Sequence, residues 1–117
     1  MSPPAEPALL ASLVLAAVLE EVIFRAGLQE ALLRWRHTAS RRCLGLSAAN
    51  LMTALLFAAA HAWTRSAWLA GATLAPALLL GWLYERRRSI WPCIALHAGF
   101  NLCWWLAAPW LAFGLRH

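Results

Sequence analysis

The fold is decided by an apolar stretch that charges interrupt, residues 8–28, which reads ALLASLVLAAVLEEVIFRAGL. A membrane-spanning helix needs about 20 predominantly apolar residues, so this stretch is long enough to form most of one. Glu20, Glu21 and Arg25 lie together in its second half. A charge at the centre of a bilayer costs roughly 2.5–3.5 kcal/mol on insertion scales, so three charges at this depth indicate a functional site inside the membrane.

The rest of the chain is similarly apolar. Of its 117 residues, 62% are hydrophobic and 13% are charged, and the mean hydropathy is +0.61. Soluble domains are nearer to about 45–50% apolar and about 25% charged. We therefore predict an all-α, polytopic membrane protein, in which a single domain over 1–117 contains about four transmembrane helices. These are expected at about 8–33, 46–63, 67–84 and 90–113, after a short polar tail, and Pro76 is expected to kink the third helix.

The charge of the chain indicates how it is oriented. All ten basic residues are arginines, and the formal net charge is +5. Most of them gather in two segments between predicted helices, a basic loop at 34–42 and a second at 85–89. Cytoplasmic loops carry such an excess and contact anionic lipid, so we expect both basic loops in the cytoplasm and both termini outside. Nucleic acid is not expected as a partner. The compact size, without a eukaryotic targeting signal, favours a bacterial inner membrane.

Several polar residues are expected to reach a similar depth in the bilayer. At 1.5 Å per residue, Glu20, His61 and Asn101 lie roughly 20 Å from the basic end of their helices, and His97 lies roughly 13 Å from it. Residues four apart share a helix face and can act together. Three such pairs are present: Glu21 with Arg25, Phe57 with His61, and His97 with Asn101.

This set of side chains suits the activation of water. Glu20 points about 100° away from Glu21 around a helix, so Arg25 can neutralise one carboxylate while the other faces a cavity. A carboxylate beside an imidazole can take a proton from water. A second histidine with an asparagine amide can donate hydrogen bonds to a developing oxyanion. Together these groups could hydrolyse an amide bond without a covalent intermediate.

In chain order, these residues resemble the EExxxR, FxxxH and HxxxN motifs of the CPBP family, also called ABI. This family comprises the CAAX-processing and bacteriocin-processing intramembrane proteases of the glutamic type. The resemblance covers about residues 20–101 and implies a role for each matched position. Glu20 would be the general base together with His61, whereas His97 and Asn101 would stabilise the oxyanion. Glu21 and Arg25 would hold the site, and Phe57 would pack against it.

The resemblance also implies substrate and partners. An endopeptidase of this kind would act on a membrane-associated protein or peptide, for example by trimming a C-terminal sorting tail. Many relatives carry extra helices before this core, which leaves open a homo-oligomer or a partner membrane protein. The family is described as metal-independent, so no cofactor and no metal are expected. The substrate, the need for prenylation and the membrane face to which the site opens are not readable from the sequence.

Two alternatives remain open at this point. Glu20, His61 and His97 could instead bind zinc, because three protein ligands plus water form a catalytic zinc pattern. The chain could also be a non-catalytic binding, immunity or scaffold protein with the same fold. Other intramembrane proteases are not indicated, because the sequence has no Asp, no HExxH and no Gly-x-Ser near a predicted transmembrane His. Gln29 and Glu30, near the end of the first predicted helix, are expected to be interfacial.

Overall fold

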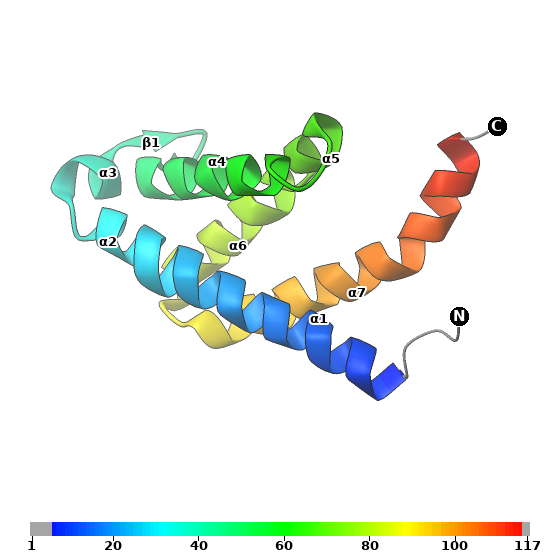
Figure 1. Ribbon diagram of the computed structural model, residues 1–117. Coiled ribbons are helices and arrows are strands. Elements are labelled where there is room, and N and C mark those ends of the chain that lie inside the picture. Colours follow the sequence, from blue (N-terminus) through cyan, green and yellow to red (C-terminus); the bar gives the residue numbers. More distant parts are fainter. Residues whose placement is uncertain (1–5, 116–117) are drawn as a thin grey trace.

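The computed structural model describes residues 6–115, which are almost entirely helical (Figure 1). The prediction of an all-α membrane protein is thereby confirmed. The elements, in chain order, are α1 (Glu6–Glu21), the π-helix η1 (Val22–Gln29), α2 (Glu30–Leu33), α3 (Arg36–Ser40), β1 (Arg42–Cys43), β2 (Leu46–Ser47), α4 (Ala48–Ala62), α5 (Ala67–Ala72), α6 (Leu74–Arg87) and α7 (Ile90–Leu115).

Three helical stretches in the described part of the chain are long and apolar enough to cross a membrane: Pro7–Leu33, Ala67–Arg87 and Ile90–Trp110. They correspond to the first, third and fourth expected spans. The second expected span, 46–63, contains α4, which has 15 residues and a length of about 22 Å. Because a bilayer core is about 30 Å thick, α4 alone is shorter than a full crossing.

A break near Pro76 divides the third spanning stretch. Helices α5 and α6 are separated at Thr73, whose backbone N–H donates to the carbonyls of Leu69 and Ala70. Pro76 has no N–H, and a proline ring clashes with the carbonyl four residues earlier, here that of Ala72. The expected kink is therefore present as a break about one turn before the proline.

The basic segment expected as a loop at 34–42 is more ordered than predicted. It contains α3 and leads into a small antiparallel hairpin in which Arg42 pairs with Ser47. The two turn residues, Leu44 and Gly45, have φ of 54° and 82°, and positive φ at both positions is what a tight hairpin turn of type I′ requires. The Ser47 side chain then caps α4 by accepting a hydrogen bond from the Asn50 N–H at 3.0 Å.

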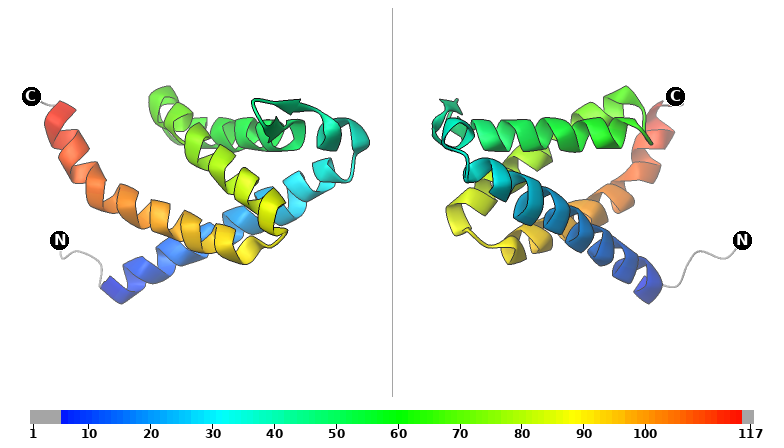
Figure 2. Two further views of the ribbon diagram at one scale, coloured as in Figure 1. Left: turned by 180° about the vertical axis from the view of Figure 1, so that it is seen from behind. Right: turned by 60° about the vertical axis from the view of Figure 1, so that its left-hand side comes forward.

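The π-helix η1 lies at the meeting point of the other helices. Helices α1 and α7 cross and contact each other, and α6 contacts both α4 and α7 (Figures 1 and 2). Segment η1 contacts α4, α6 and α7. A side chain that points inward from η1 or from the end of α1 can therefore reach three other helices.

The packing places polar side chains inside and large apolar ones outside. Leu15 and Ile23 are 58% and 59% exposed, as expected for side chains that face lipid. Buried alanines such as Ala17, Ala49 and Ala54 let the helix backbones approach closely. The largest fully buried side chains are mostly polar and include Glu21, Arg25, Gln29, Asn50 and Thr53. Intramembrane polar groups that face the bundle interior mark functional sites.

Candidate active site

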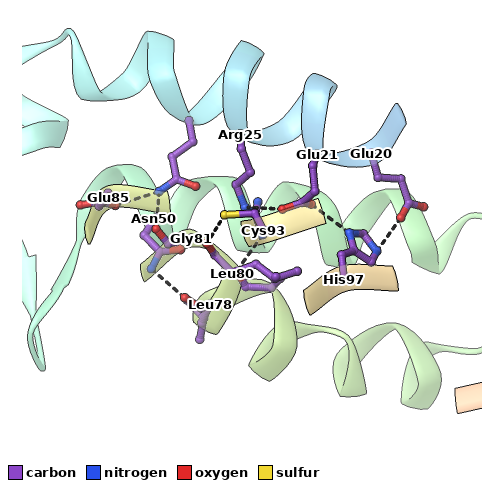
Figure 3. Close-up of polar contacts among 12 residues, drawn as sticks. Glu20, Glu21, Arg25, Asn50, Leu78, Leu80, Gly81, Glu85, Cys93 and His97 are labelled. Carbon is purple, nitrogen blue, oxygen red and sulfur yellow. Dashed lines mark hydrogen bonds and ion pairs between the residues drawn. The ribbon is translucent and has the colours of Figure 1, made fainter. Parts of the chain in front are cut away.

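The two adjacent glutamates end α1, directly before the π-helical segment η1 (Figure 3). In a π-helix the backbone hydrogen bonds join residues i and i+5, and such segments are rare and occur frequently at functional sites. Glu21 is fully buried, and so are Arg25 and Gln29, the next residues at intervals of four. Glu20 points in a different direction, and 32% of its side chain remains exposed. The two carboxylates therefore occupy different environments.

Glu21 and Arg25 form a buried ion pair between α1 and η1. The Arg25 Nε atom lies 3.4 Å from Glu21 Oε1, and both side chains are fully buried. The Arg25 Nη2 group donates a hydrogen bond to the Ala77 carbonyl of α6 at 2.9 Å. Because removing a charge from water costs several kcal/mol, each of these two charges depends on the other. Arg25 thus fixes Glu21 and ties η1 to α6.

His97, which comes from α7, lies between the two glutamates (Figure 3). Its Nδ1 atom is 2.9 Å from Glu21 Oε2, and its Nε2 atom is 2.9 Å from Glu20 Oε2. A carboxylate oxygen accepts hydrogen bonds, so both contacts are N–H···O bonds when the ring carries a proton on each nitrogen. The imidazole therefore links the buried carboxylate to the one that remains partly exposed.

His61 approaches Glu20 from α4 on the other side. Its Nδ1 atom lies 2.8 Å from the Phe57 carbonyl, which can only accept, so this nitrogen carries the proton. In the neutral ring the Nε2 atom is then an acceptor, and it faces Glu20 Oε1 at 3.6 Å, too far for a direct hydrogen bond. The Phe57 ring lies against the imidazole with centroids 4.2 Å apart and is itself packed edge-on by Phe24 at 5.0 Å.

Five of the seven expected site residues line one cavity of about 570 Å³: Glu20, Phe57, His61, His97 and Asn101. Most other residues around it are apolar. The Asn101 Nδ2 group donates to the Leu13 carbonyl at 3.2 Å, which holds its side chain at the wall. The remaining two expected residues, Glu21 and Arg25, are fully buried behind Glu20 and His97. The structure thus brings together residues from α1, α4 and α7.

A second polar network adjoins the site and was not anticipated. The Gln29 Nε2 group donates to the Gly81 carbonyl at 3.0 Å and to Glu85 Oε2 at 2.8 Å, and the Ser47 hydroxyl donates to the same oxygen at 2.6 Å. Gln29, which was expected to be interfacial, has a side chain that is fully buried within the bundle. Gln29 lies four residues after Arg25 and so shares its helix face, and this spacing could have indicated the burial of Gln29. Glu30 is partly buried and accepts a hydrogen bond from the Tyr84 hydroxyl at 2.6 Å.

The side chains of the site are not arranged as a zinc site. Within residues 6–115, no three His, Cys, Asp or Glu side chains are placed so that they could hold one metal ion. The His97 nitrogens are both directed at carboxylates, and the protonated Nδ1 of His61 faces a carbonyl. The arrangement of Glu20, His61 and His97 therefore does not fit a bound zinc ion. The three cysteines are free.

Comparison with known proteins gives one match. A family model described as type II CAAX prenyl endopeptidase, Rce1-like, matches residues 3–103, and this range includes all seven expected site residues. No curated protein and no solved structure matches the chain.

Proposed function

Because the chain belongs to the Rce1-like family of type II CAAX prenyl endopeptidases, we propose that it is a glutamic-type intramembrane endopeptidase in which Glu20 activates water. Membership in this family, together with the three apolar helices, makes the protein an integral membrane protease. The observation that carries the proposal is the placement of the Glu20 carboxylate between two imidazoles at the wall of the cavity.

Water would be activated between Glu20 and His61. Glu20 Oε1 and His61 Nε2 are both acceptors and lie 3.6 Å apart, so a water molecule beside them can donate one hydrogen bond to each. As the water oxygen attacks the substrate carbonyl carbon, Glu20 takes one of its protons. Glu20 later passes this proton to the amine as the peptide C–N bond breaks. No covalent intermediate with the protein is required.

His97 and Asn101 would stabilise the oxyanion that forms during this attack. In the free protein the His97 Nε2–H group points at Glu20 Oε2, at 2.9 Å. When Glu20 gains a proton its carboxylate charge disappears, so this N–H group becomes available to the negatively charged substrate oxygen. The Asn101 amide has two N–H donors, and Leu13 accepts only one of them. The second donor remains available at the cavity wall.

Glu21, Arg25 and Phe57 would act through their neighbours. Glu21 fixes the His97 ring by binding its Nδ1–H group, and Arg25 keeps the Glu21 charge in place. Phe57 holds the His61 ring through stacking and orients it through its own carbonyl. These three residues therefore position the side chains that contact water or substrate.

The proposal is tested by replacing Glu20 with glutamine, which keeps the shape and removes the base. The membrane-anchored C-termini of cells that produce wild type or the variant are compared by quantitative proteomics. We expect fragments that depend on wild type to disappear with Glu20→Gln. Glu30→Gln, a carboxylate change outside the cavity, is the matched control and should preserve them.

Two outcomes would contradict this mechanism. If both variants accumulate in the membrane and the fragments persist in Glu20→Gln, the residue is not the base, and a non-catalytic binding, immunity or scaffold role gains support. For a fragment that is identified, cleavage by the purified protein should continue in chelator. Loss of cleavage in chelator and its return on addition of zinc would favour the metal-dependent alternative.

We further propose that the protein lies in the bacterial inner membrane with its basic segments in the cytoplasm. The two basic segments are joined at one end of the molecule, where Glu30 accepts from Arg88 at 2.8 Å and lies 3.8 Å from Arg34. The beginning of α1 and the end of α7 lie toward the opposite side in Figure 1. The positive-inside rule then places both termini outside the cytoplasm.

A further inference from the structure

One charged side chain of the cavity wall has no role in the mechanism above. Arg65 lines the cavity together with Glu20 and His61, and it follows the end of α4. Leu69, Trp104 and Trp105 also line this cavity and add apolar surface to its wall. Arg65 is exposed, so its guanidinium group lies at the accessible part of this wall, and because it stays charged under all ordinary conditions it can bind an anionic partner there.

Among the described residues no carboxylate forms a direct ion pair with Arg65, although Glu20 interacts with its charge at longer range. Glu20 and Glu21 contact His97, and Glu30 contacts Arg88. Glu85 accepts hydrogen bonds from Gln29 and Ser47. None of the ion pairs found in the part of the chain that the structure describes includes Arg65. Arg25, by contrast, pairs with Glu21 and donates a hydrogen bond to a carbonyl of α6.

The backbone of Arg65 is held in place relative to the reacting groups. Its backbone N–H donates to the His61 carbonyl at 2.9 Å, so it continues the last turn of α4. Phe57, His61 and Arg65 therefore follow one another at intervals of four along the cavity wall. One helical turn advances about 6 Å, and an extended peptide advances about 3.3 Å per residue. The guanidinium group thus lies within reach of a substrate atom a few residues from the bond that faces Glu20.

We infer that Arg65 binds a carboxylate of the substrate peptide and thereby selects the peptide bond that is presented to Glu20. The inference rests on the proposed function for the identity of the reacting group. A terminal carboxylate fits best, because the rest of this wall is apolar and one anionic group at the end of an apolar chain would match it. Arg65 is a specificity residue in this scheme and takes no part in the proton transfers.

Binding rather than cleavage gives the decisive test. Two short fluorescein-labelled peptides of alanine and leucine, identical except for a free C-terminal carboxylate or a C-terminal amide, are titrated into full-length protein in phosphatidylcholine nanodiscs. We expect wild type to bind the carboxylate peptide about fivefold more tightly, the scale of a partly exposed ion pair. Arg65→Gln should bind both peptides equally, and Arg65→Lys should keep part of the preference.

Additional variants test whether the preference for the carboxylate peptide depends on Arg65 alone. Arg87→Gln, a matched change at an exposed arginine outside the cavity, should retain the full preference. Arg65→Glu should instead favour an amidated peptide that ends in lysine. The same preferences are expected in the Glu20→Gln background, so a failure of the proposed chemistry would leave them unchanged.

Three results would overturn the inference. The first is wild-type protein that binds the two peptides equally or does not bind the carboxylate peptide. The second is a preference that persists in Arg65→Gln. The third is a preference that vanishes when phosphatidylglycerol replaces phosphatidylcholine, because an anionic lipid headgroup would then be the partner of Arg65.

Discussion

Replacing Arg25 with methionine should destabilise the protein strongly while preserving most of the side-chain volume. Glu21 and Arg25 are fully buried with 3.4 Å between Arg25 Nε and Glu21 Oε1, and breaking a buried pair of this kind typically costs 3–5 kcal/mol. The His97 Nδ1 atom remains 2.9 Å from Glu21 Oε2 and still compensates part of the buried Glu21 charge. We therefore expect a loss of stability at the lower end of this range, about 3 kcal/mol. The loss should fall to about 1 kcal/mol in the double variant Glu21→Gln/Arg25→Met, which removes both charges.

The free energy of unfolding can be measured by titrating the protein in mixed micelles with sodium dodecyl sulfate. The fluorescence of the eight tryptophans reports the transition. Arg87→Met, which removes an exposed arginine, is the matched control and should change stability by less than about 0.5 kcal/mol. If Arg25→Met costs under about 1 kcal/mol, or if the double variant is less stable than the single one, then the pair is not the electrostatic unit described above.

Two other predictions concern packing and orientation. A Cβ atom on Gly81 would lie 1.9 Å from Asn50 Oδ1, so Gly81→Ala should lower the free energy of unfolding by about 1–3 kcal/mol in the same titration. A Cβ atom on Gly99 would have no atom within 4 Å, so Gly99→Ala should cost nothing. Equal effects of the two variants would contradict the close contact of α4 with α6. In a bacterial host, a C-terminal alkaline phosphatase fusion should be active and a C-terminal green fluorescent protein fusion dark, and the reverse pattern would refute the proposed topology.

The sequence predicted the helical fold because its signals are local. Apolar runs and basic gaps gave three long helices close to their observed positions, starting at Pro7, Ala67 and Ile90. The hairpin between β1 and β2 was missed, since its strands have two residues each and a leucine occupies one of the two turn positions with positive φ. The shortness of α4 was also missed, because the apolar run around it is longer than the helix.

The candidate site was predicted in its composition but not in its contacts. Residues four apart on one helix can be paired from the sequence, as Glu21 and Arg25 were. The location of His97 between two carboxylates depends on how α7 crosses α1, and no local pattern encodes that crossing. The burial of Gln29 depends in the same way on the approach of α6, which supplies the Gly81 carbonyl and Glu85.

This bundle buries polar and small side chains and exposes large apolar ones, and this packing determines which positions can change as homologous sequences diverge. In a water-soluble protein the leucines and isoleucines are the most constrained residues, because they fill the core. Here Leu15 and Ile23 are more than half exposed on the outer surface, so other apolar side chains would serve at these positions nearly as well. Ala17, Ala49 and Ala54 are fully enclosed between helices, so a single added methyl group there would push two backbones apart. Evolutionary drift should therefore be fast among the large aliphatic residues of this protein and slow among its smallest ones.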